Sequence, residues 1–98
     1  MKEVWIVDGV RTPIGRMGGA LSGFRPEELA AFALKGLIDK TKIDPAIVED
    51  VLIGHACTNN MAVNIGRWAV LKAGFPVSVT AQTVERQCGS ALQTINSA

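Results

Sequence analysis

Cys88 is the residue of this 98-residue chain that is most clearly suited to a catalytic role. It comes after a β-prone run, residues 77–84, and is followed at once by Gly89, Ser90 and a helix-forming stretch. A cysteine on such a sharp strand-to-helix turn, a nucleophile elbow, has its sulfur lifted clear of the sheet edge. Because the unpaired N–H groups of the first helical turn stabilise an anionic sulfur, the pattern predicts a nucleophilic thiolate.

Thioester exchange is the chemistry that best suits this cysteine. Transfer of an acyl group between two thioesters is nearly isoenergetic, so Cys88 could accept the group and return it without a deep energy well. The small residues Gly89 and Ser90 leave room for a thioester to approach. The alternative interpretation is a buried structural cysteine on a helix.

An alternation of short strands and helices leads to Cys88. Compact runs of apolar, β-branched residues predict strands, and a proline or capping residue marks the start of each helix. Pro26, followed by Glu27 and Glu28, is one such start, and Asp44 before Pro45 opens a further short turn. The predicted order is strand 4–7, a helix from Pro26, strand 51–54, helix 64–73, strand 77–84 and a helix after Cys88.

This order predicts an α/β fold in which right-handed crossovers give a mostly parallel sheet with helices packed on it. Hydrophobic residues make up 48% of the chain, and 10 further residues are glycine. Together they exceed the roughly 45–50% of an ordinary soluble domain, which suggests elements buried on both faces. The glycine-rich stretch 11–25 suits a loop, and the length allows one domain at most.

Charge and cysteine content exclude several classes of protein. With 10 basic and 9 acidic residues, the chain gives no electrostatic reason to expect a nucleic acid or an anionic membrane as partner. No apolar run is long enough to span a membrane and no signal-peptide pattern is present, so we expect a cytoplasmic protein. Cys57 and Cys88 form no CxxC pattern, so neither a disulfide framework nor a metal site is expected.

Three segments give the chain a resemblance to the thiolase family, of the acetyl-CoA C-acetyltransferase type. They are residues 10–16 with Gly19, residues 64–76, and residues 86–90 around Cys88. The segments match the family in order and spacing, and the resemblance covers the whole chain. The chain therefore resembles the N-terminal quarter of a thiolase, ending just after the nucleophilic cysteine.

The resemblance implies a fold and a site. Thiolases contain two similar halves in αβαβα layers, so residues 1–98 are expected to form one incomplete domain, a partial thiolase half-domain. The family's nucleophile corresponds to Cys88, which would accept the acyl group of acyl-CoA and donate its main-chain N–H to the oxyanion. A second thiolate and a histidine belong to the C-terminal half. Coenzyme A thioesters are then substrates, and no covalently bound cofactor is implied.

Several expectations concern the chain as a piece of a larger assembly. We expect the isolated chain to be inactive, either as a fragment of a longer protein or as one component of a split enzyme. The complete enzyme is expected to act on acyl-CoA in fatty acid metabolism. The expected protein partner is a complementing C-terminal chain or a second copy, which would associate through residues 79–84. The alternatives are a ketoacyl or hydroxymethylglutaryl-CoA synthase relative, and a non-catalytic assembly fragment.

Two residues depart from the family pattern near the cysteine. Glu85 stands where asparagine is usual, and Ala91 stands where glycine is usual. A carboxylate facing the site would oppose the thiolate, whereas one facing away could pair with Arg86 or with a partner subunit. We expect both departures to be tolerated, with a slow, specialised or inactive enzyme as the other outcome.

The remaining polar and aromatic candidates have simpler interpretations. We expect His55 to be a loop or interface residue and Cys57 to be a buried or partly exposed thiol without a catalytic role. Arg11 and Arg67 are expected to fix loops, with phosphate binding as the alternative. The tryptophans are expected to pack in the core or at an interface; they are Trp5 and Trp68.

Overall fold

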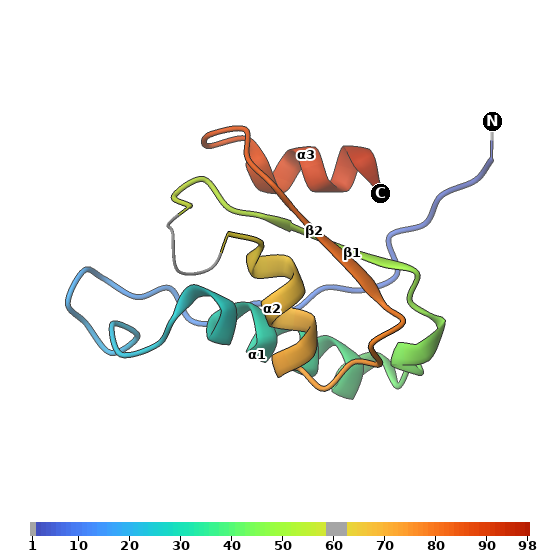
Figure 1. Ribbon diagram of the computed structural model, residues 1–98, viewed down its shortest axis with the longest axis horizontal. Coiled ribbons are helices and arrows are strands. Elements are labelled where there is room, and N and C mark those ends of the chain that lie inside the picture. The colour runs from blue at the N-terminus through green and yellow to red at the C-terminus, as the bar shows by residue number, and fades with distance from the viewer. Residues whose placement is uncertain (1, 59–62) are drawn as a thin grey trace.

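Helices cover both faces of a short parallel sheet (Figure 1). The computed structural model describes residues 2–58 and 63–98. Helices α1 and α2 lie on one face and α3 lies on the other. In chain order the elements are α1 (Pro26–Thr41), the 3₁₀ turn η1 (Pro45–Ile47), β1 (Asp50–Gly54), α2 (Ile65–Lys72), β2 (Thr80–Val84) and α3 (Ser90–Ser97).

The sheet consists of β1 and β2 in parallel, from the pair Asp50 and Thr80 to the pair Gly54 and Val84. At its start, the Asp50 carboxylate accepts hydrogen bonds from Thr80 Oγ1 at 3.0 Å and from Gln82 Nε2 at 2.9 Å. Because α2 connects two parallel strands, the predicted α/β class with a parallel sheet is confirmed.

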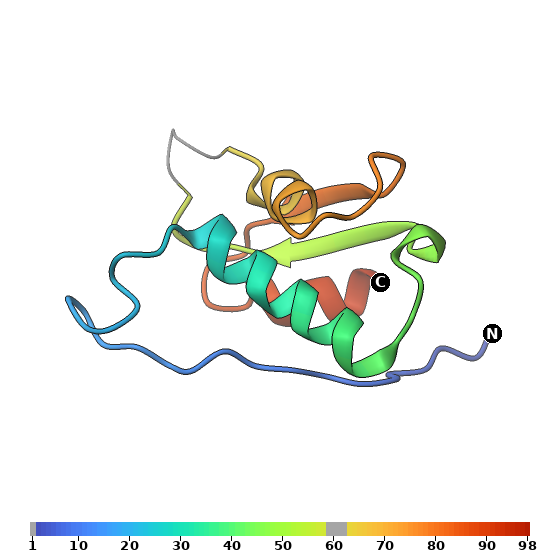
Figure 2. The same cartoon turned by 90° about the horizontal axis from the view of Figure 1, so that it is seen from below.

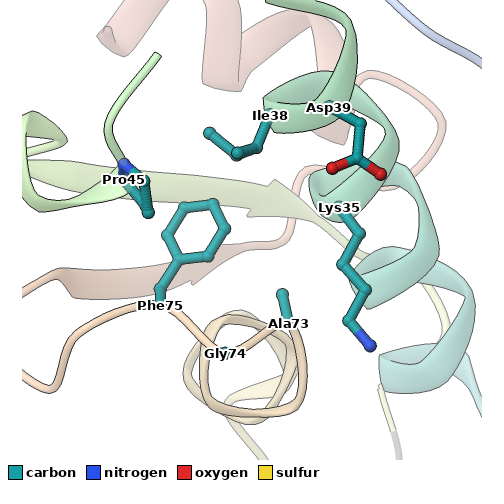
Figure 3. Close-up of a pocket in the computed structure, with 7 residues that line it drawn as sticks. All are labelled: Lys35, Ile38, Asp39, Pro45, Ala73, Gly74 and Phe75. Atoms are coloured by element: carbon teal, nitrogen blue, oxygen red, sulfur yellow. The ribbon is translucent and has the colours of Figure 1, made fainter. Parts of the chain in front are cut away.

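The core lies between this sheet and the helices α1 and α2. Its buried members are Val51, Val70, Phe75 and Val79, and half-buried side chains from α1 pack against them. Figure 3 shows how Phe75 points between α1 and the segment before β1. The cavity that it lines has a volume of about 170 Å³ and lies where the chain enters the two strands.

The helix ends follow the local sequence signals. Pro26 is the first residue of α1, and the Glu28 carboxylate accepts a hydrogen bond from the main-chain N–H of Arg25 at 3.3 Å. Asn64 caps α2 by accepting from the N–H of Arg67 at 3.2 Å. Gly74, just beyond α2, has a φ of +80°, the left-handed conformation predicted for it.

The predicted strand at residues 4–7 is wrong. Residues 2–15 are extended but outside the sheet, and Val4 and Ile6 are more than 80% exposed. This segment runs past α1 (Figure 2), where Lys40 Nζ donates to Asp8 Oδ1 at 2.8 Å and to the Gly9 carbonyl at 3.1 Å. Strand-forming residues make a strand only where the edge of a neighbouring strand supplies hydrogen bonds. In this structure residues 4–7 lie beside no such edge among the described residues.

The third predicted strand, residues 77–84, is shorter than expected. Its first residues form a turn in which Val79 N–H donates to the Pro76 carbonyl at 3.0 Å, and β2 begins at Thr80. Arg67 fixes this turn from α2, since its guanidinium donates to the carbonyls of Val79 at 2.7 Å and Val77 at 3.3 Å. The expectation that Arg67 fixes a loop is therefore confirmed.

Replacing Arg67 tests this contact. We expect Arg67→Ala to lower the free energy of unfolding by about 1–3 kcal/mol, because two carbonyls lose a charged donor. Arg67→Lys should recover little of the loss, since an ammonium group lacks the forked geometry of a guanidinium. Denaturant unfolding measures the effect, with exposed Arg16→Ala as the matched control. Equal stabilities of the Arg67→Ala and Arg16→Ala variants would contradict the assignment.

Glu27 is a buried carboxylate that the sequence pattern did not predict. Its side chain is fully buried at the start of α1, where Arg25 Nε donates to Oε1. The hydrogen bond from Arg25 holds the pKa of Glu27 below its ordinary value of 4.5, against the opposing effect of desolvation, and the charge of Lys72 acts in the same direction as Arg25. The ionised carboxylate therefore links the first turn of α1 to its capping residue Arg25.

The lowered pKa of Glu27 predicts a pH dependence of folding. Because the folded protein releases this proton more readily than the unfolded chain, the stabilisation is complete above pH 4.5 and is lost as the pH falls through the folded pKa. In Glu27→Gln, the free energy of unfolding should be lower at pH 7 and should fall less steeply on acidification. Urea unfolding from pH 7 to pH 3 measures this, with exposed Glu3→Gln as control. An unchanged acid slope would exclude the assignment.

Candidate active site at the Cys88 elbow

The chain turns sharply between the end of β2 at Val84 and the start of α3 at Ser90. Within this turn, Gly89 N–H donates to the Arg86 carbonyl at 3.0 Å and Ser90 N–H donates to the Gln87 carbonyl at 3.2 Å. Residues 85–89 are called the elbow below. The predicted strand-to-helix turn is thus confirmed, and Cys88 is exposed on it rather than buried as a structural cysteine would be.

Gln87, the residue before the cysteine, has a φ of +49°. A residue with a β-carbon rarely adopts this left-handed conformation, so its neighbours must hold it there. Its N–H donates to Glu85 Oε1 at 2.5 Å, and its carbonyl accepts from Ser90 Oγ at 2.6 Å. Side chains on both sides of Gln87 therefore fix its peptide groups.

Glu85 does not pair with Arg86, one of the partners expected for it. Its carboxylate accepts a hydrogen bond from the Gln87 N–H within the turn, whereas the Arg86 guanidinium donates to Gln93 Oε1 on α3. Ala91, the other departure from the family pattern, is exposed, so its methyl group causes no overpacking. Both substitutions are therefore compatible with the geometry of the elbow.

Gly54, the last residue of β1, sets the position of the start of α3. A β-carbon at Gly54 would lie 2.5 Å from Ala91 N and 2.7 Å from the carbonyl carbon of Ser90. Both distances are shorter than a van der Waals contact, and the atoms belong to the main chain, which cannot move aside easily. Only glycine allows α3 to begin this close to the sheet.

The start of α2 is fixed to the same end of the sheet. Asn64 Oδ1 accepts from Thr83 Oγ1 at 2.7 Å, and Asn64 Nδ2 donates to the Ala81 carbonyl at 3.2 Å. Thr83 Oγ1 in turn accepts from the Gly66 N–H at 3.1 Å. Thr83 thereby joins the strand that ends at the elbow to the cap of α2, a role that its position in the sequence does not reveal.

Two further candidates lie beyond the carboxyl end of β1. The main-chain N–H of His55 donates to the Val84 carbonyl at 3.0 Å, which extends the ladder by one residue. Its Nδ1 atom is buried without a hydrogen-bond partner among the described residues. Cys57 is exposed on the loop that follows. Because parallel strands end at the same edge, both residues lie on the side of the sheet that carries Cys88.

The remaining candidates lie apart from the elbow. Arg11 Nη1 donates to the carbonyl of the adjacent Thr12 at 3.1 Å, a local contact of the kind expected for a loop residue. Trp5 and Trp68 are 76% and 47% exposed, so neither packs in the core, and packing at an interface stays a prediction.

A hollow of about 320 Å³ lies beside the elbow, between it and the outer side of α3; it is lined by Arg86, Gly89, Leu92, Gln93 and Asn96. Across residues 2–58 and 63–98, no three histidine, cysteine or acidic side chains gather as a metal site would require. Within the same ranges, no helix has the length and apolar character needed to cross a membrane.

Comparison with known proteins identifies the family. The family model for the thiolase N-terminal domain matches residues 4–98. A steroid 3-ketoacyl-CoA thiolase of Mycobacterium tuberculosis is 47% identical over 98% of the chain and 24% of its own length. A beta-ketoadipyl-CoA thiolase of Escherichia coli is 44% identical over 97% of the chain and 24% of its own length. The chain belongs to the thiolase family.

A solved structure supports the same assignment. The acetyl-CoA acetyltransferase of Bacillus anthracis superposes with a TM-score of 0.86 at 42% identity, over 91% of this chain and 23% of that one. The partial thiolase fold predicted from the sequence is therefore confirmed. The chain spans about a quarter of the length of the curated relatives that it matches.

Gly54→Ala tests the contact between β1 and α3. We expect a loss of about 1–3 kcal/mol in the free energy of unfolding, because the new methyl group meets main-chain atoms of Ser90 and Ala91. Gly36→Ala is the matched control, since a β-carbon there meets nothing within 4 Å and the residue lies inside α1. The control should be more stable than the unmodified protein by about 0.5–1 kcal/mol. A Gly54→Ala variant of unchanged stability would show that the contact is looser than described.

Proposed function

We propose that the protein containing this chain is a thiolase that transfers acyl groups between coenzyme A thioesters, with Cys88 as the acyl acceptor. The observation that carries the proposal is the exposed Cys88 in the turn that begins α3, at the end of a parallel strand. The named relatives act as 3-ketoacyl-CoA and beta-ketoadipyl-CoA thiolases, which supports the same class of reaction.

In the proposed first step, the Cys88 thiolate attacks the carbonyl carbon of the acyl thioester. The carbonyl oxygen becomes an oxyanion, to which the main-chain N–H of Cys88 would donate a hydrogen bond. Collapse of this tetrahedral intermediate breaks the bond to the coenzyme A sulfur and releases coenzyme A as a thiolate. The acyl group then remains on Cys88 as a thioester, ready for transfer to a second acceptor.

The remaining catalytic groups are proposed to come from other parts of a full-length thiolase. The resemblance implies a second thiolate and a histidine in the C-terminal half, and the chain covers about a quarter of its relatives. We therefore propose that residues 1–98 are the N-terminal part of the thiolase N-terminal domain, a single incomplete domain, and that they complete a turnover only together with that half. The thiolase reaction is favoured over the synthase alternative because the family match and the named relatives are thiolases.

Acylation of Cys88 is the test of this proposal. After incubation with acetyl-CoA in the presence of the complementing C-terminal half and acid quenching, peptide mass mapping should find an acetyl group on the peptide that contains Cys88. Cys88→Ala should abolish the label, whereas the matched variant Cys57→Ala, which removes the other exposed thiol, should retain it. Thiolysis of acetoacetyl-CoA should follow the same pattern when the complementing C-terminal half is present. Labelling of Cys57 instead, or of neither cysteine, would refute the proposal.

A further inference from the structure

We infer that Ser90 is a positioning residue, whose hydroxyl group holds the elbow in the conformation that presents Cys88. The inference rests on the proposed role of Cys88 as the nucleophile. Ser90 is 4% exposed, and its Oγ atom both accepts from the Arg86 N–H at 2.8 Å and donates to the Gln87 carbonyl at 2.6 Å. A buried hydroxyl that uses both its donor and an acceptor site is committed to this turn.

The hydroxyl acts on the residue that needs support. Gln87 has a φ of +49°, a conformation that a residue with a β-carbon leaves readily unless its peptide groups are held. Ser90 supplies two donors to the Gln87 carbonyl, its Oγ atom at 2.6 Å and its main-chain N–H at 3.2 Å. Glu85 holds the other side of the same residue by accepting its N–H at 2.5 Å.

Ser90 is itself held by the sheet. The close contact of Gly54 with the main chain of Ser90 and Ala91 fixes the first turn of α3 against the end of β1. The end of β1 thus fixes Ser90, and the Ser90 hydroxyl fixes the peptide group of Gln87. Gln87 in turn sets the direction in which the chain enters Cys88. Removing the hydroxyl alone should release the elbow while leaving the sheet and α3 in place.

The alkylation rates of the two exposed cysteines test this inference. With iodoacetamide as the probe, the rate at Cys88 is measured by peptide mass mapping, and Cys57 serves as the internal reference in the same sample. We expect Ser90→Ala to lower the ratio of the Cys88 rate to the Cys57 rate about fivefold to tenfold, as the loss of one or two hydrogen bonds would. Ser78→Ala, an exposed serine in the turn before β2, is the matched control and should leave the ratio unchanged.

A second variant separates positioning from general stability. Glycine adopts a positive φ without strain, so adding Gln87→Gly to Ser90→Ala should restore part of the lost rate ratio. Circular dichroism checks that each variant is folded. An unchanged ratio in Ser90→Ala would overturn the inference, as would a fall that Gln87→Gly does not reverse. Because alkylation needs no acyl-CoA, this outcome is independent of whether Cys88 is acetylated, so failure of the proposed function and failure of the inference remain distinguishable.

Discussion

The close approach of Gly54 to the first turn of α3 is the constraint on which the candidate site depends. No other residue type lets the main chain of Ser90 and Ala91 lie this near the end of β1. Only residues 85–89 connect β2 to α3, so the chain must turn sharply to bring α3 to this contact. Within this short turn Gln87 has a positive φ and Cys88 is exposed.

The two ends of the sheet have different roles. At the carboxyl end, the starts of α2 and α3 are fixed by polar contacts and by glycines, among them the link between Asn64 and Thr83. At α2 the N–H groups of Gly66 and Arg67 donate to Thr83 and Asn64, and at α3 the Ser90 N–H donates to the Gln87 carbonyl, so both helix starts are held in place. At the other end, Phe75 and its neighbours form an apolar contact that supports the sheet. Packing at one end thus supports the end at which the chemistry is proposed.

Much of this arrangement could be predicted from the sequence because its signals are local. Pro26 marked the start of α1, Asn64 the cap of α2 and Gly74 its end, and each signal depends on residues within one turn. The small residues after Cys88 indicated the elbow for the same reason. Local signals were sufficient to predict the helix ends and the elbow because the residues there favour one backbone conformation.

The parts that were not predicted depend on distant residues. The segment 4–7 has the composition of a strand, but a strand also needs a neighbouring edge, and sequence pattern carries no information on that. The burial of Glu27 depends on how α1 packs on α2, and the role of Thr83 depends on Asn64, 19 residues earlier. The partner of Glu85 depended on the φ of Gln87, which no composition rule indicates.

The central claim is that the elbow presents Cys88 as the acyl acceptor, and a crystal structure of the protein soaked briefly with an acyl-CoA tests it most directly. The account predicts continuous electron density from Cys88 Sγ to the acyl carbon, with Gln87 still in the left-handed conformation and the Ser90 hydroxyl still bonded to its carbonyl. An acyl group on any other side chain, or an acyl-CoA bound away from the elbow with Cys88 unmodified, would contradict it.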